Sequence, residues 1–340
     1  MKNVTIIGGR AITAENLLNI LVNHSEVEVR HITTSSGESM EVEKFYPQFA
    51  GKLSLNFEPY NLEKFKDDTD VYFLCVGHGE GFEIAKELYE KTNALIIDLS
   101  ANFRLENAAD YDNWYKFSHP YPEMLPSAAY GLTELNAEAI GAARLIACHG
   151  CYPTSFILGI TPLLQEDIVI NPNVTFAAIS GISGAGRKAL EATDFSGSAV
   201  NIHPYKIGFH QHTAEMEQGM KIASGNEMQV LFIPQVGDFP NGISGEIVVD
   251  LKESVDLEHL KKAYSDFYSE EPFVKVLDTF PELKNVVGTN NAEIFLSLDE
   301  RTNKLVISVA IDNTIKGASG QAVQNMNLCL GFPETQGFKG

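Results

Sequence analysis

The first fourteen residues constrain the fold of this chain more than any other stretch. Residues 4–7 (Val-Thr-Ile-Ile) are a β-branched run typical of a buried strand, and they lead into residues 8–11 (Gly-Gly-Arg-Ala). Apolar residues then recur at helical spacing through 17–21. A strand, a small-residue turn and a helix open a dinucleotide-binding fold, in which the pyrophosphate lies on the helix N-terminus. An ordinary βα turn is the alternative, because Ala11 and Ala14 stand where this fingerprint usually has glycines.

Apolar runs of strand length at 27–33, 70–76 and 94–100 continue this alternation with helical segments. They predict an α/β fold with a Rossmann-type doubly wound sheet, whose ligands bind beyond the carboxyl ends of its strands. The first of these runs ends in hydroxyl residues, where NAD-binding domains usually carry an acidic residue that grips the ribose. Uncharged donors beside Arg10 suit a 2′-phosphate and favour NADP, although Glu38 lies close by.

Two loops beyond later strand ends add candidate contacts in this domain. The glycine-rich stretch 77–81 suits a loop over the cofactor, although its histidine could equally be an ordinary loop residue. Arg104 is a candidate to bind phosphate through its guanidinium fork, with a surface ion pair as the alternative. The cofactor-binding residues predicted in this domain are Gly8, Arg10, Ala11, Ile12, Thr13, Ser35, Gly77 and His78.

A cysteine stands between a short apolar strand at 142–147 and a helix that we expect to begin at Pro153 or Thr154. Cys151 would lie close to the helix N-terminus, where unpaired N–H groups lower a thiol pKa and produce a reactive thiolate. A small buried hydrophobic residue is one alternative. A redox or zinc half-site with Cys148 is another, but the chain has no second cysteine pair, and we predict no metal.

The pattern changes in the second half of the chain. A strand expected at 174–180 leads into a glycine-rich loop with two cations at 181–188, which could bind an anion or be an ordinary surface loop. Residues 229–251 and 292–312 alternate like the strands of an antiparallel or mixed sheet. A helix with a small-residue start follows, running through residue 330.

Three side chains near residue 212 form a second candidate cluster. On a helix, His212 and Glu215 are three residues apart on one face, so the carboxylate can orient the imidazole. His210 and His212 could instead bind a metal, but no third ligand is evident.

Composition limits the class of protein. The chain has 340 residues, 44% of them hydrophobic, which is enough for two domains with cores of their own. Its formal net charge of −20 repels nucleic acid and anionic membranes, so we expect neither as a partner. No apolar run reaches the ~18 residues of a membrane helix. The N-terminus enters a strand without a signal peptide, and four cysteines suggest no disulfide framework, so we expect a cytoplasmic protein.

Taken together, several motifs resemble the N-acyl-γ-glutamyl-phosphate reductase family of the semialdehyde dehydrogenase superfamily, whose enzymes act in arginine biosynthesis. The resemblance covers nearly the whole chain. Its most specific motifs are Asp98-Leu-Ser-Ala-Asn-Phe-Arg104, Ala129-Tyr-Gly-Leu-Thr-Glu134, Gly150-Cys-Tyr-Pro-Thr154, Ser180-Gly-Ile-Ser-Gly-Ala-Gly-Arg187, His210-x-His212-x-x-Glu215 and Asp312-Asn-x-x-Lys-Gly-Ala-x-Gly-Gln-Ala-Val-Gln-Asn325.

The resemblance implies a reaction and assigns roles. Cys151 would attack a γ-acyl phosphate, and the resulting thioester would accept a hydride from NADPH to give a semialdehyde. His212 would be the acid/base, Glu215 would orient it or contact substrate, and Arg104 would bind the departing phosphate. The remaining implied contacts are Ser183, Arg187 and His210 to the substrate, and Gly184, Asn313, Lys316 and Gly317 to the cofactor.

The resemblance also implies an architecture. Residues 1–150 would form the NADP-binding domain, completed by a C-terminal helix within 317–340. Residues 151–316 would form an α+β catalytic domain whose sheet supports a homodimer or homotetramer. Aminoadipyl-phosphate or aspartyl-phosphate reduction is an alternative activity within the superfamily. A non-catalytic dinucleotide-binding sensor is an alternative of another class.

The sequence departs from the family pattern at three places. The glycine fingerprint of the first turn is reduced, and His149 replaces the proline that usually precedes Gly150. The stretch 239–245 lacks the Met and Arg that the family generally carries there. A changed cation at that place could accompany an N-succinyl rather than an N-acetyl substrate.

Overall fold

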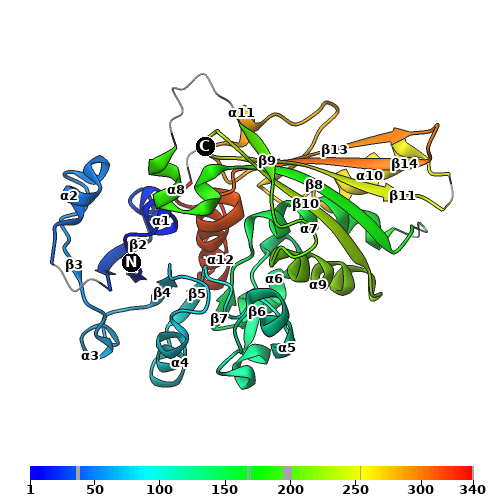
Figure 1. Cartoon of the computed structure of the whole chain (residues 1–340). Helices are drawn as coiled ribbons and strands as arrows, with labels where there is room; N and C mark the ends of the chain where they lie inside the picture. Colours follow the sequence, from blue (N-terminus) through cyan, green and yellow to red (C-terminus); the bar gives the residue numbers. More distant parts are fainter. Residues whose placement is uncertain (36–38, 167, 169, 194–200, 253, 339–340) are drawn as a thin grey trace. The chain divides into compact units, whose positions relative to one another are not determined.

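The structure is a computed structural model that describes residues 1–35, 39–166, 168, 170–193, 201–252 and 254–338. The chain forms two compact units, which are described separately (Figure 1). Unit 1 contains residues 1–149 and 318–340, and unit 2 contains residues 150–317.

Unit 1 is built on a sheet of seven parallel strands in the order β3-β2-β1-β4-β5-β7-β6. Strands β2 and β3 follow β1 on one side, and β5, β7 and β6 follow β4 on the other, so the order reverses between β1 and β4. In open α/β sheets a ligand-binding crevice forms at such a point. The strands are β1 (Lys2–Ile7), β2 (Val27–Thr33), β3 (Phe57–Glu58), β4 (Val71–Leu74), β5 (Leu95–Asp98), β6 (Ala128–Tyr130) and β7 (Leu145–Ala147).

The last helix of the chain returns to unit 1, where it packs against α1, α6 and β5. Its apolar side chains at positions 322, 323 and 326 are buried, and so are four amides at positions 321, 324, 325 and 327. Asn325 accepts a hydrogen bond from the Thr133 hydroxyl and donates to the Gly131 carbonyl. The helices of unit 1 are α1 (Ile12–Leu21), α2 (Val42–Phe45), α3 (Leu62–Phe65), α4 (Phe82–Lys91), α5 (Ala108–Asp110), α6 (Thr133–Ala142) and α12 (Gly320–Leu330), with shorter turns at Pro47–Phe49, Tyr111–Tyr115 and Pro122–Ser127.

Unit 2 contains a mixed sheet in the order β12-β13-β14-β11-β8-β10-β9. The pairs β8–β10 and β12–β13 are parallel, and the other pairs are antiparallel. The strands are β8 (Asn173–Gly181), β9 (Ile202–Pro204), β10 (Gln229–Gly237), β11 (Ile243–Asp250), β12 (Val274–Val276), β13 (Ala292–Asp299) and β14 (Lys304–Ile311). The remaining elements are α7 (Cys151–Gln165), α8 (Arg187–Ala192), α9 (His212–Ser224), α10 (Leu257–Phe267), α11 (Leu283–Val286) and single turns at Ile182–Ala185 and Ile315–Ser319.

Helices α7, α9 and α10 pack on strands of this sheet, and the buried Phe156 of α7 lies against Phe176 of β8. Residues that alternate with Phe176 along β8 are only half-buried. On β10 the same alternation leaves Leu231 53% exposed. The second face of the sheet is therefore more open than the face that carries α7.

The start of one helix differs from the expected pattern, and this difference matters for the chemistry. The second strand spans Val27–Thr33 as predicted, whereas α7 begins at Cys151 rather than at Pro153 or Thr154. Cys151 is thus the first residue of the helix, and Gly150 is its N-cap. The short strand β6 lies outside the stretches that were expected to form strands.

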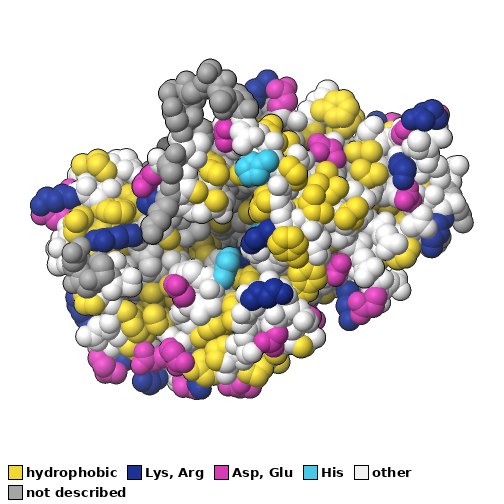
Figure 2. Space-filling view, in the orientation of Figure 1, with side chains coloured by type: hydrophobic (Ala, Val, Ile, Leu, Met, Phe, Trp, Pro, Cys, Tyr) yellow, Lys and Arg dark blue, Asp and Glu magenta, His cyan; other side chains and the backbone are white. Residues whose placement is uncertain are grey.

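Charged side chains on the face shown in Figure 2 are scattered, with acidic and basic groups interspersed among apolar ones. The described lysines and arginines on that face form no continuous band. Within the described part of the chain, no helix has both the length and the apolar character to cross a membrane.

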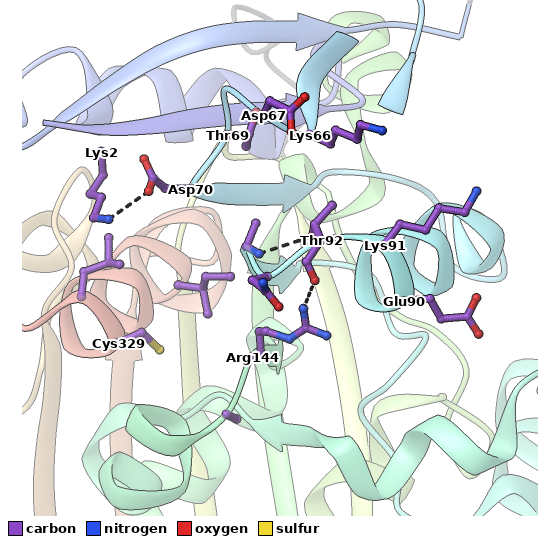
Figure 3. A pocket seen from close by; sticks show the side chains of 15 residues that line it. Lys2, Lys66, Asp67, Thr69, Asp70, Glu90, Lys91, Thr92, Arg144 and Cys329 are labelled. Atoms are coloured by element: carbon purple, nitrogen blue, oxygen red, sulfur yellow. Dashed lines mark hydrogen bonds and ion pairs between the residues drawn. The ribbon is translucent and has the colours of Figure 1, made fainter. Parts of the chain in front are cut away.

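A cavity of about 700 Å³ opens at the amino-terminal edge of the parallel sheet in unit 1 (Figure 3). Its charged side chains are paired locally: Lys2 binds Asp70 at 2.9 Å, and Arg144 donates to backbone carbonyls of Tyr89 and Thr92. None of the predicted site residues lines it. Ligands of this fold class bind at the opposite, carboxyl edge, so we assign no function to this cavity.

Candidate active site

Cys151 is partly exposed and lies at the N-terminus of a helix. It is the first residue of α7, and no side chain caps this helix end. The other three cysteines differ, because burial raises the pKa of Cys75 and Cys148 to about 12 and that of Cys329 to about 11. Only thiolates are strong nucleophiles, so those three thiols are unsuited to attack at neutral pH.

The backbone before the cysteine gives His212 room to approach. A Cβ atom built on Gly150 would lie 2.5 Å from Nε2 of His212 and 2.8 Å from two of its ring carbons. Contacts that short do not occur between real atoms, so the imidazole occupies space that any other residue at position 150 would fill. The predicted acid/base is thereby held against the residue that precedes the predicted nucleophile.

Glu215 lies one helical turn after His212 and is fully buried. Its Oε2 accepts the backbone N–H of Gly150 at 3.0 Å. The carboxylate therefore joins helix α9 to the N-cap of α7, and it fixes the same glycine against which the imidazole lies. Buried carboxylates need such charge-assisted partners, which makes the junction rigid.

His210 is buried and caps helix α9. Its Nδ1 accepts the backbone N–H of His212 at 3.1 Å, and its carbonyl accepts that of Thr213. Its ring lies edge-on to Tyr152, Tyr205 and Phe232. Burial, assisted by the nearby Lys206 charge, lowers the pKa of His210 to about 3, so the ring is neutral. Its predicted contact with substrate stays a prediction, and its visible role is to position His212.

Tyr205 is a residue that sequence reasoning missed. Burial and the Cys151 charge raise its pKa to about 12, and its hydroxyl interacts with that of Tyr152. The Tyr152 hydroxyl in turn donates to the Gln235 carbonyl at 2.8 Å. An isolated tyrosine in a loop carries no pattern, so only its place in the fold reveals it.

A second close approach occurs on the other side of Cys151. A Cβ atom at Gly317 would lie 2.7 Å from the Cβ of Cys151, so this turn also needs a glycine. The neighbouring Lys316 is fully buried, with its ammonium 5.6 Å from the centre of the Phe273 ring. The turn is ordered by Asp312, whose Oδ1 accepts the N–H groups of Thr314 and Ile315.

Asn313 joins three loops near this turn. Its Oδ1 accepts the backbone N–H of Gly242 at 2.6 Å, and its Nδ2 donates to the Ser183 hydroxyl at 2.9 Å. Backbone N–H groups of residues 181–183 also bind the carbonyls of residues 239, 240 and 242. The stretch that lacks the family's Met and Arg is thus held directly against the glycine-rich loop. Gly184 and Arg187 follow on that loop and are at least partly exposed.

The predicted cofactor residues of unit 1 gather where the strand order reverses. Gly8 has φ +86°, and a Cβ atom there would lie 2.2 Å from the Cys75 carbonyl oxygen, so the turns after β1 and β4 touch. The Tyr46 hydroxyl donates to the Gly9 carbonyl at 3.0 Å and holds the turn. Helix α1 begins at Ile12 without a side-chain cap, which leaves its first N–H groups available to a pyrophosphate.

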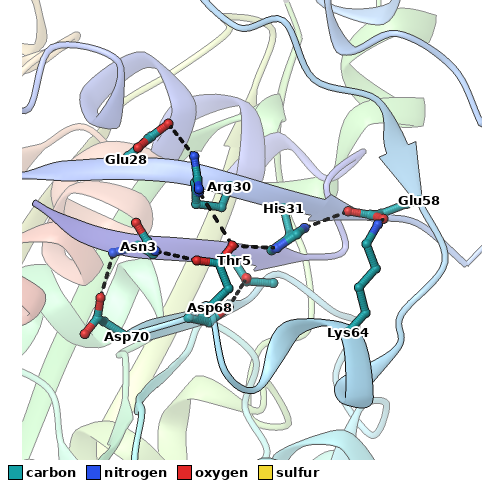
Figure 4. Close-up of polar contacts among 10 residues, drawn as sticks. Asn3, Thr5, Glu28, Arg30, His31, Glu58, Lys64, Asp68 and Asp70 are labelled. Atoms are coloured by element: carbon teal, nitrogen blue, oxygen red, sulfur yellow. Dashed lines mark hydrogen bonds and ion pairs between the residues drawn. The ribbon is translucent and has the colours of Figure 1, made fainter.

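Arg10 reaches the side of the sheet where a 2′-phosphate would lie. Its guanidinium is 5.3 and 5.4 Å from the ring centres of Phe45 and Phe57, and Phe57 pairs with the end of β2. The Glu58 carboxylate contacts His31 at 2.8 Å and forms an ion pair with Lys64 (Figure 4). Ser35 is exposed, whereas residues 36–38, including Glu38, lie outside the described residues.

The Asp98 to Arg104 motif orders the loops after β4 and β5. Asn102 accepts the Gly79 N–H at 2.9 Å, and His78 accepts the Ala101 N–H at 3.0 Å. The 77–81 loop is thus tied to this motif, and His78 is exposed beyond it.

Arg104 itself is 5% exposed and donates to the carbonyls of Cys148, at 2.6 Å, and Leu99, at 3.0 Å. Burial raises the pKa of Asp98 to about 6, with the Arg104 charge opposing the shift. Arg104 therefore joins the ends of β5 and β7, and its binding of phosphate stays a prediction.

His149, the departure from the family pattern before Gly150, is buried in unit 1 with its ring centre 3.7 Å from that of Tyr130.

Among the residues that the structure describes, no group of three or more His, Cys, Asp or Glu side chains is placed to hold a metal ion.

Comparisons with known proteins agree with this architecture. Residues 3–143 match the family model described as semialdehyde dehydrogenase, NAD binding domain. Residues 151–313 match the model described as semialdehyde dehydrogenase, dimerisation domain. The two matches together span most of the chain.

Individual relatives are similar over full length. An N-acetyl-gamma-glutamyl-phosphate reductase of Halothermothrix orenii is 40% identical, covering 100% of this chain and 98% of its own. Aspartate semialdehyde dehydrogenase II from Vibrio cholerae has a similar fold, with TM-score 0.72, 16% identity and coverage of 97% and 98%. The Candida albicans aspartate semialdehyde dehydrogenase, solved with NADP, gives TM-score 0.71, 15% identity and coverage of 96% and 98%.

Proposed function

Since the chain belongs to the N-acetyl-γ-glutamyl-phosphate reductase family of semialdehyde dehydrogenases, we propose that it reduces N-acetyl-γ-glutamyl phosphate to N-acetylglutamate 5-semialdehyde and phosphate, with NADPH as reductant. One observation supports this most directly. His212 and Glu215 converge on Gly150, the residue before a cysteine that begins a helix. Covalent acyl transfer needs a nucleophile and an acid/base in that relation.

In the proposed reaction the Cys151 sulfur forms a bond to the γ-carbonyl carbon, and the bond from that carbon to the phosphate oxygen breaks. Bound NADPH supplies the hydride that reduces the resulting thioester. His212 protonates the oxygen that becomes negative, and later takes a proton back when the carbon–sulfur bond breaks and the semialdehyde leaves. Positioned acid/base groups contribute about 10²–10⁴-fold in rate. The N–H groups at the start of α7 stabilise the oxyanion and the returning thiolate.

The residues of unit 1 fit NADP. The turn at Gly8 and the uncapped start of α1 suit the pyrophosphate. Arg10 supplies a cation near the end of β2, and the Glu58 carboxylate that could repel a 2′-phosphate is paired with Lys64 and in hydrogen-bond contact with His31.

Self-association is part of the proposal. The match to a dimerisation domain and the open second face of the sheet support a homodimer or homotetramer formed through that face. Leu231, 53% exposed on β10, would then be buried between subunits. Sedimentation of Leu231→Lys tests this surface, and an unchanged assembly contradicts it. The predicted cytoplasmic location belongs to the same proposal.

The test of function is the reverse reaction. Purified protein should reduce NADP⁺ in the presence of N-acetylglutamate semialdehyde only when inorganic phosphate is added. NAD⁺, the N-succinyl analogue, aspartate semialdehyde and aminoadipate semialdehyde are the competing substrates. Faster turnover of one of these would reassign the cofactor or substrate, and no phosphate-dependent turnover of any would contradict the proposal.

A further inference from the structure

The proposed substrate carries an α-carboxylate as well as its phosphate, in a protein with a formal net charge of −20. An anion is drawn to such a chain only by local cations. Cations of unit 2 near Cys151, His210 and His212 are therefore candidates for recognition of the carboxylate. Arg187 is an implied substrate contact, but the family motifs do not say which group of the substrate it binds.

Lys206 is a cation that lies beside the start of the helix that carries His212. Its Nζ donates to Oε1 of Gln211, at 3.1 Å, and Gln211 immediately precedes His212. Its charge also contributes to the lowered pKa of His210. The ammonium is thus held beside the beginning of α9.

The backbone around Lys206 holds it in an unusual conformation. Lys206 has φ 48°, which is uncommon for a residue other than glycine, and its carbonyl accepts the Phe209 N–H at 3.2 Å. The preceding Tyr205 donates its N–H to the Pro234 carbonyl of β10 at 3.1 Å. Backbone conformations of this kind often accompany a binding role.

Lys206 also differs from most other described lysines in its partner. Lys221, on the same helix as His212, binds the Glu227 carboxylate, whereas the partner of Lys206 is a neutral amide. No carboxylate of a described residue lies within ion-pair distance of Lys206. Its positive charge is therefore not neutralised by a described neighbour, and the side chain is exposed to an incoming ligand.

We propose that Lys206 binds the α-carboxylate of the acyl-glutamyl substrate and so distinguishes it from acyl phosphates that lack this group. The inference rests on the proposed function and adds a specificity-determining residue to it. Ile207 and Phe209, 45% and 65% exposed on the same loop, offer apolar surface beside the ammonium. The substrate has a carboxylate next to an acylated amine, so it presents a negative charge beside an apolar acyl group. The ammonium and the apolar side chains of this loop complement these two groups.

The test compares two aldehydes in the reverse reaction, N-acetylglutamate semialdehyde and 4-acetamidobutanal, which is the same molecule without the α-carboxylate. Lys206→Ala and Lys206→Gln should raise KM for the first aldehyde about tenfold with little change in kcat or in KM for NADP⁺. Lys206→Arg should recover most of the affinity. The second aldehyde, measured as a competitive inhibitor where its turnover is too slow, should bind wild type and variants within about twofold of each other.

Lys221→Ala is the matched control, because it removes the same charge from an exposed lysine of the same unit. It should leave both KM values unchanged, which separates a local contact from a general change in net charge. Equal losses on both aldehydes, or no loss on either, would overturn the assignment of Lys206. Wild-type protein that oxidises neither the semialdehyde nor its analogues would instead refute the proposed function, which keeps the two failures distinguishable.

Discussion

Gly150→Ala isolates the contact between the residue before the nucleophile and the proposed acid/base. The backbone of Gly150, at φ −70° and ψ 153°, is open to alanine without strain. Its N–H would still donate to Glu215. The added methyl group would lie 2.5 Å from Nε2 of His212, so the substitution acts through the imidazole.

The size of the effect follows from that distance. Ordinary van der Waals contact begins at 3.4 Å, so the ring or the methyl group must move by about 0.9 Å. A displacement near 1 Å in a reacting constellation costs about 10²-fold in rate, which corresponds to about 2.7 kcal/mol of transition-state stabilisation. We expect kcat to fall about 100-fold, within the range lost when a general acid/base is removed.

The assay is phosphate-dependent oxidation of the semialdehyde, with NADP⁺ affinity and alkylation of Cys151 measured on the same preparation. Both should remain close to wild type, because the three atoms nearest to the added methyl group, apart from those of its chain neighbours, all belong to His212. Gly141→Ala is the matched control: a Cβ atom at this glycine of α6 meets nothing within 4 Å. That control should be fully active and as stable as wild type or up to about 1 kcal/mol more stable.

Full activity in Gly150→Ala would refute the reasoning, because the imidazole could then be displaced without consequence. Equal loss of NADP⁺ binding would show misfolding rather than a displaced catalytic group. A fall in kcat without either of those changes supports the geometry.

Three further predictions concern the same unit. Cys151→Ser should abolish turnover and leave NADP⁺ binding intact; measurable turnover with the serine variant contradicts a thioester. Asn313→Ala removes two buried hydrogen bonds and should lower the free energy of unfolding by about 2–4 kcal/mol in urea titrations, and a loss below 0.5 kcal/mol would contradict its role in joining loops. The pKa of His210 falls from 6.5 to about 3 on folding, so the unfolded chain binds more protons between these values and stability is lost as pH falls through that window. His210→Gln should weaken that pH dependence, and an identical pH profile of unfolding would show that another group causes it.

Much of the fold was predictable because it depends on local patterns. The strand at Val27–Thr33 and the switch from parallel to mixed sheet follow from alternation and run length. The helix that begins at Cys151 was expected to begin two or three residues later, since Pro153 is typical of a first helical turn. Pro153 is in that turn, but at its third position.

The sequence could propose a set of site residues but not their geometry. Helical spacing predicts that His212 and Glu215 share one face of a helix, whereas the approach of His212 to Gly150 joins residues 62 positions apart. The sequence did not indicate that two nitrogens of Arg104 bind backbone carbonyls, and its contact with phosphate stays a prediction. It did not indicate either that the amide of Asn313 joins two loops, and its contact with the cofactor stays a prediction. Long-range contacts of this kind leave no periodic signal in a single sequence.

The return of α12 to unit 1 has a consequence for how the chain is made. The parallel sheet is complete at residue 147, but the helix that packs on α1, α6 and β5 is synthesised only after the whole of unit 2. During synthesis the first 149 residues therefore keep apolar surface uncovered until residues 318–330 emerge, while residues 150–317 can already fold as a unit. Premature termination before residue 318 should consequently yield a product that needs chaperones or is degraded.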